Sequence, residues 1–108
     1  MYIMHMKPIV FLGTSLESIR NLPPSVKREA GYELDKVQRG NQPNDWKAMP
    51  NIGSGVREIR IRLRGAWRVI YVANRDEAIY VLHAFQKKTQ RTSKRDVAAI
   101  ESALKELR

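Results

Sequence analysis

The spacing of the hydrophobic positions changes along the chain, and it predicts a different element in each segment. Residues 9–12 form a short apolar run, which indicates a buried strand rather than a helix. Apolar side chains then recur every three or four positions through 16–22 and through 26–37, as expected for two amphipathic helices. Pro23 separates these helices and Gly40 ends the second one. Together they predict a helical hairpin.

The second half of the chain predicts three strands and a last helix. Residues 56–63 alternate between apolar and charged side chains, while 67–73 and 79–85 are rich in β-branched and aromatic ones. Ser93 is a typical helix N-cap at the start of an apolar stripe with helical spacing. The Pro and Gly residues of 41–55 predict a loop before the first of these strands.

The resulting order, strand-helix-helix-strand-strand-strand-helix, predicts an α+β fold. We expect a small twisted antiparallel sheet that packs against the N-terminal helical hairpin and is followed by the C-terminal helix. With 108 residues the chain can form one compact core, so 1–108 is interpreted as a single domain.

Composition excludes several classes of protein. The chain has no cysteine, which rules out disulfide scaffolds, cysteine-bound metals and thiol nucleophiles. Its two histidines, His5 and His83, are far apart and have no carboxylates beside them in sequence, so we expect neither a metal nor another cofactor. No apolar run approaches the roughly 20 residues of a membrane span, and the N-terminus lacks a signal-peptide pattern. A cytoplasmic protein with no membrane partner is expected.

Positive charge is concentrated in the middle of the chain. The net charge is +9, yet residues 53–95 alone contain eleven Lys or Arg residues against Glu58, Asp76 and Glu77. A nucleic acid is the expected partner of such a segment, although a merely solvated sheet face would have the same composition.

Two strands of this segment contain arginines that are candidates for phosphate contact. Alternation places Arg60 and Arg62 on the charged face of one strand, roughly 7 Å apart and beside Glu58. Arg68 lies in an apolar strand, where an unpaired guanidinium is unfavourable. It therefore requires an anion, which is either Glu58 or a phosphate.

The third strand and the segment after it add further candidates. Residues 86–92 are basic and hydroxyl-rich, and they predict either a polar loop or a phosphate track. His83 lies in an otherwise apolar strand, where it is a hydrogen-bonded core residue or a proton donor and acceptor. Tyr71 is a core residue or a platform for an RNA base.

Three segments resemble the HigB-like, phage-derived branch of the RelE/ParE toxin superfamily: 57–60 (REIR), 67–71 (WRVIY) and 82–92 (LHAFQKKTQRT). That branch is marked by an E-L-R strand, a Y-R-V-x-Y strand and the motif L-H-x-F-x-K-K-T-Q-K-T-P. The resemblance extends from Lys7 to the final helix, and the last motif is the most specific. The departures are Trp67 in place of Tyr, Ile59 in place of Leu and Ser93 in place of Pro, and none removes a functional group.

The resemblance implies a RelE-like fold and the toxin of a type II toxin–antitoxin module, which cleaves mRNA on the ribosome without a metal. In such a reaction the RNA 2′-hydroxyl attacks the adjacent phosphodiester, and cations stabilise the charge that develops. The implied catalytic residues are Arg60, Arg68, His83, Lys87 and Lys88. Among these, His83 is the first candidate for proton transfer and a lysine is the second. The expected RNA-binding residues are Arg62, Tyr71, Arg91 and Lys94.

The resemblance also implies the partners. These are mRNA on the ribosome and a cognate antitoxin, expected to be a helix-turn-helix protein encoded next to the toxin and to be its only link to operator DNA. Two alternatives stay open: a ParE-like toxin that poisons DNA gyrase, and a basic domain that binds nucleic acid without catalysis.

Overall fold

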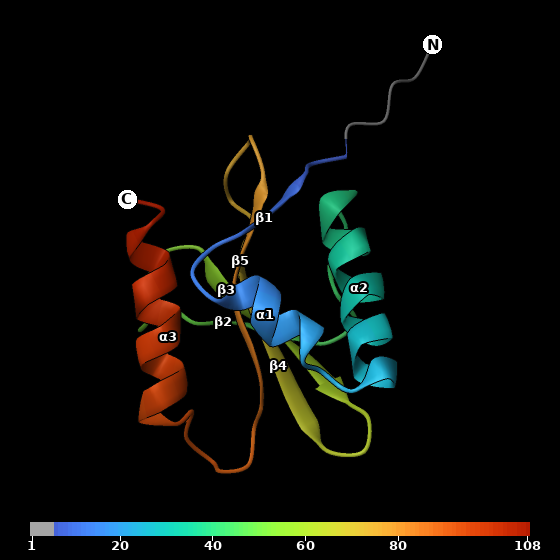
Figure 1. Ribbon diagram of the computed structural model, residues 1–108. Helices are drawn as coiled ribbons and strands as arrows, with labels where there is room; N and C mark the ends of the chain where they lie inside the picture. Colours follow the sequence, from blue (N-terminus) through green and yellow to red (C-terminus); the bar gives the residue numbers. More distant parts are fainter. Residues whose placement is uncertain (1–5) are drawn as a thin grey trace.

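The computed structural model describes residues 6–108, so His5 lies outside the described part of the chain. Three helices and five strands follow one another along it (Figure 1). In chain order they are β1 (Ile9–Phe11), α1 (Ser15–Arg20), α2 (Pro24–Gln38), β2 (Trp46–Ala48), β3 (Val56–Arg62), β4 (Ala66–Val72), β5 (Ile79–Gln86) and α3 (Lys94–Lys105). The fold class is α+β, as the hydrophobic pattern predicts.

The five strands form one sheet in the order β1-β5-β4-β3-β2. The pairs that join β2 through β5 are antiparallel, but β1 runs parallel to β5. The expectation of an antiparallel sheet is therefore correct for four strands and wrong for the first. Most of the chain lies between β1 and β5, and a parallel pair requires such a long connection.

The strand β2 lies in the segment that the sequence predicts to be a loop. Trp46 pairs with Ile59, and Lys47 pairs with Glu58 on β3. Three residues are too few to reveal alternation, and the Pro and Gly residues around them favour a turn. The segment becomes a strand because β3 offers it a free edge.

Helices cover both faces of the sheet, with α2 on one side and α3 on the other (Figure 1). Adjacent residues of β4 belong to different cores, since Val69 packs with α2 whereas Ile70 packs with α3. Leu22, which follows α1, joins the α2 core. Of the predicted helical hairpin, α2 covers one face, while α1 packs along β5 and reaches His83 through Ser18. The helix α3 closes a second core around Ile100 and Leu104.

Candidate nucleic-acid site

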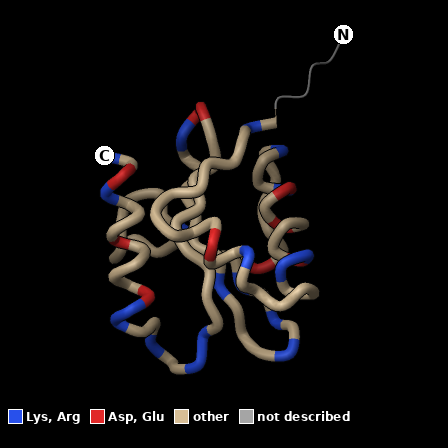
Figure 2. Tube along the Cα trace, viewed as in Figure 1, with Lys and Arg blue, Asp and Glu red and all other residues tan. Residues whose placement is uncertain are grey.

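Charged side chains of β3 lie on the same face of the sheet that α3 covers. Val56 is buried in the α3 core, and alternation places Glu58 and Arg60 after it on the same face. Lysines and arginines gather at the end of the molecule formed by the β3–β4 hairpin and the loop from β5 to α3 (Figure 2). This end of the α3 face is the candidate site.

Arg60 and Arg68 lie directly opposite each other on β3 and β4. Opposed residues of an antiparallel pair project from the same face of the sheet, so the two guanidinium groups share one surface. Glu58 accepts a hydrogen bond from Nε of Arg60 at 3.0 Å, and its other oxygen lies 3.8 Å from Nε of Arg68. One carboxylate therefore orients both arginines, which are called the arginine pair below.

The members of the arginine pair differ in their contact with solvent. The Arg68 side chain is 10% exposed, whereas that of Arg60 is 27% exposed. Nη1 of Arg68 donates to the carbonyl oxygen of Trp67 at 3.0 Å, but within residues 6–108 its Nε has no hydrogen-bond partner. Burial lowers the pKa of the Arg68 guanidinium, while Glu58 raises it. A cation in this partly dry position acts more strongly on a nearby anion than an exposed one.

A pocket of about 430 Å³ opens beside Arg60. A further cation, Lys47 of β2, also lines this pocket, because it lies opposite Glu58 in the pairing of β2 with β3. Lys87 lies on its other side, directly after β5, where its backbone N–H donates to the carbonyl of Ala66 at 2.7 Å. The pocket is lined by Lys47, Ala48, Met49, Pro50, Asn51, Ile52, Glu58, Arg60, Lys87, Gln90 and Thr92.

The other predicted cations do not line this pocket, and all four are exposed. Lys88 and Arg91 are exposed and line a smaller hollow of about 170 Å³ next to the start of α3. Lys94 is exposed in the first turn of α3, and Arg62 is exposed at the end of β3. These four side chains can contact a phosphate backbone without losing buried partners.

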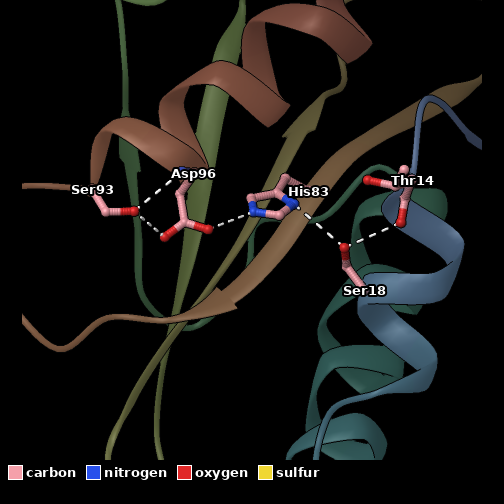
Figure 3. A network of polar contacts seen from close by, with 5 residues as sticks. All are labelled: Thr14, Ser18, His83, Ser93 and Asp96. Atoms are coloured by element: carbon pink, nitrogen blue, oxygen red, sulfur yellow. Dashed lines mark hydrogen bonds and ion pairs between the residues drawn. The ribbon is translucent and has the colours of Figure 1, made fainter.

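His83 projects from the same face as the arginine pair, but both of its ring nitrogens have polar contacts with helices (Figure 3). Its Nε2 lies 2.7 Å from Oδ1 of Asp96 on α3, and its Nδ1 lies 3.4 Å from Oγ of Ser18 on α1. Ser93 caps α3 by accepting from the backbone N–H of Asp96 at 3.1 Å. The ring also stacks on Phe85. Of its two predicted roles, this geometry matches the hydrogen-bonded core residue.

Tyr71 is placed in the core and not on the candidate site. Its side chain belongs to the α2 core and its exposed fraction is 0%. Burial raises the pKa of its hydroxyl, and the positive charge of Arg57 opposes the shift. The expectation that Tyr71 contacts RNA is wrong on this geometry, because no base can reach the ring.

Sequence reasoning did not find the residues of the pocket wall. Lys47 comes to lie beside Glu58 only through the pairing of β2 with β3. Met49 and Ile52 pack partly into the α3 core, while Asn51 and Gln90 are exposed at the rim. Gln90 lies inside the motif of 82–92, whereas the sequence carries no motif for Lys47, Met49, Asn51 or Ile52.

The chain matches a known family over most of its length. Residues 17–105, from α1 to the end of α3, match the family model described as "Phage derived protein Gp49-like (DUF891)". A search of curated proteins finds no match. Within residues 6–108, no helix has the length and apolar character needed to cross a membrane.

Proposed function

Since the chain belongs to the Gp49-like family of phage-derived proteins, a RelE-like toxin family, we propose that it is the toxin of a type II toxin–antitoxin module. We further propose that it is an RNA endonuclease of the HigB-like branch, which arrests translation by cutting ribosome-bound mRNA. The observation that supports this activity is the partly buried arginine pair oriented by Glu58.

The proposed reaction requires only RNA and groups that accept and donate protons. The 2′-oxygen of one nucleotide bonds to the adjacent phosphorus, while the bond from phosphorus to the 5′-oxygen breaks. The 2′-hydroxyl loses a proton and the leaving 5′-oxygen gains one. The products are a strand that ends in a 2′,3′-cyclic phosphate and a strand that begins with a 5′-hydroxyl.

The arginine pair stabilises the extra negative charge on the phosphorus oxygens as the 2′-oxygen attacks. Arg60 is the member that borders the pocket, so it contacts the phosphate directly, and Arg68 adds its charge from beneath. Lys87 lines the same pocket and binds the phosphate from the other side. Lys87 is the pocket residue that can exchange a proton with the reacting oxygens, whereas Glu58 is buried and held by the arginine pair. Lys88 and Arg91 line the neighbouring hollow together and hold the strand on one side of the cut.

Glu58→Gln tests this proposal most directly. It keeps the shape of the side chain but removes the charge that orients the arginine pair. In a reconstituted translation reaction, the wild type should stop synthesis and produce mRNA fragments with 5′-hydroxyl ends. Glu58→Gln should cut at least roughly 100-fold more slowly, as expected when an oriented catalytic group is lost. Glu101→Gln, at an exposed position of α3, is the matched control.

Two readouts separate the proposal from its alternatives. If DNA synthesis falls before protein synthesis and gyrase is trapped covalently on DNA, the proposed RNA cleavage is wrong and a ParE-like activity takes its place. Ribosome binding without any new mRNA ends would replace the proposal with a non-catalytic binding domain.

The proposed antitoxin covers the candidate site. The net positive charge of this face favours an acidic partner segment, and association between opposite charges weakens as salt rises. The affinity of the purified pair should therefore fall between low and high salt. A salt-independent affinity would place the antitoxin on another surface.

A further inference from the structure

The pocket beside Arg60 has two walls of different chemistry. One wall is basic and includes Arg60 and Lys87. The other is formed by residues 49–52, in which the Met49 and Ile52 side chains are half-buried. A bare phosphate would occupy the basic wall and leave the apolar wall in contact with water. The ligand that fits both walls carries an anionic group and a flat or apolar group together.

The apolar wall is held in place before any ligand binds. The Met49 N–H donates to the carbonyl of Val56 at 2.8 Å, and the Ile52 N–H donates to the carbonyl of Met49 at 3.1 Å. The Met49 and Ile52 side chains also pack against the α3 core. A fixed wall costs less ordering free energy on binding than a loop that must fold around its ligand.

Two side-chain amides from different segments of the chain complete the rim. Asn51 comes from the turn before β3, and Gln90 comes from the loop between β5 and α3. Both are exposed, so neither has to leave a buried environment to contact a ligand. An amide offers one donor group and one acceptor next to each other, which matches the paired donors and acceptors on the edge of a nucleobase.

We propose that this pocket binds one nucleotide of single-stranded RNA and reads its base. The phosphate binds Arg60 and Lys87, and the face of the base lies against 49–52. The edge of the base contacts Asn51 and Gln90. The volume of about 430 Å³ is in the range of pockets that hold small organic ligands. This inference rests on the proposed function, and it makes 49–52 and Gln90 the determinants of where the RNA is cut.

Binding of single nucleotides tests the pocket without any cleavage. The four nucleoside 5′-monophosphates are titrated separately into the full ¹⁵N-labelled chain, with ribose 5-phosphate as the probe that lacks a base. At least one mononucleotide should bind roughly tenfold more tightly than ribose 5-phosphate, the size of one good base contact. It should also shift the side-chain amide signals of Asn51 and Gln90.

The double variant Asn51→Ala/Gln90→Ala should lose this roughly tenfold advantage and keep its affinity for ribose 5-phosphate. Because both residues are exposed, the variant should fold like the wild type. Asn41→Ala, in the exposed segment after α2, is the control and should leave all affinities unchanged. Equal affinity of the wild type for ribose 5-phosphate and for every mononucleotide would overturn the inference.

The failure of the pocket and the failure of the proposed function have different signatures. If a mononucleotide binds in the expected way but no RNA is cut, the proposed cleavage is wrong and the base pocket stands. If RNA is cut and the double variant keeps the base preference of the wild type, the base pocket is wrong and the cleavage stands.

Discussion

The Nε2 atom of His83 lies 2.7 Å from Oδ1 of Asp96, so the imidazole ring joins the interior strand β5 to the first turn of α3. The other ring nitrogen lies 3.4 Å from Oγ of Ser18 on α1. A side chain with two such contacts and little exposure holds elements together, and it is poorly placed to exchange protons with a substrate.

His83→Ala should therefore reduce stability more than chemistry. Loss of the ring removes one of the two side-chain partners of Asp96 and the contact with Phe85, which should lower the free energy of unfolding by about 2–4 kcal/mol. Cleavage per folded molecule should stay within about tenfold of the wild type, since no transition-state contact is lost. Denaturant unfolding and single-turnover cleavage are measured on the same samples. A variant that is as stable as the wild type but cleaves much more slowly would show that His83 is a catalytic residue.

Arg68→Ala should slow the reaction with little effect on binding. Its charge lies in a partly dry position next to Glu58, and in the proposed reaction it acts on charge that develops only in the transition state. We expect cleavage to fall roughly 10²–10³-fold, which corresponds to about 2.7–4 kcal/mol. Ribosome binding is measured by sedimentation.

Arg91→Ala is the control for Arg68→Ala, because it removes one exposed loop arginine. It should weaken binding slightly and leave the cleavage step unchanged. Melting curves of both variants show whether the loss of the Glu58 contact has unfolded the protein. A folded Arg68→Ala protein that cuts at the wild-type rate would contradict the assigned role.

Tyr71→Phe should stabilise the protein relative to the wild type at alkaline pH. The Tyr71 hydroxyl is buried, and the guanidinium of Arg57 acts on it, so its removal should change the free energy of unfolding at neutral pH by less than about 1 kcal/mol. Burial raises the pKa of this hydroxyl in the folded state. The unfolded chain then releases the proton first, and wild-type stability falls as the pH rises above about 10.

Urea unfolding of both proteins between neutral and alkaline pH measures this difference. Other groups that titrate in the range affect both proteins equally, so only the gap between the two curves is informative. A gap that stays constant with pH would show that the ionisation of Tyr71 is not coupled to folding.

Two glycines should respond in opposite directions to substitution by alanine. Gly31 lies inside α2, and a Cβ there would meet no atom within 4 Å. Gly31→Ala should stabilise the fold by about 0.5–1 kcal/mol through the lower entropy of the unfolded chain. Gly13 has a φ of +55°, and its Cβ would lie 3.1 Å from the Cβ of Ala103 on α3. Gly13→Ala should therefore destabilise the fold, and thermal unfolding of both variants checks the signs.

The local pattern of the sequence is sufficient for most of the elements. Alternation in 56–62 and helical spacing in 24–38 give β3 and α2 almost at their observed bounds. The helix N-cap at Ser93 is likewise as predicted. These features depend on interactions between residues close in sequence, so the sequence alone determines them. The basic segment and the motifs of the toxin family are also properties of the sequence.

The site itself was decided by contacts between distant segments. Alternation assigns Arg68 and Tyr71 to opposite faces of β4, but only the packing of α2 and α3 decides which face is left open to a ligand. The opposition of Arg60 to Arg68 depends on the register of two strands. The strand β2 exists because the edge of β3 was free, and it brings Lys47 to the pocket. Pairing register and helix placement follow from the free energy of the whole core, which no short stretch of sequence encodes.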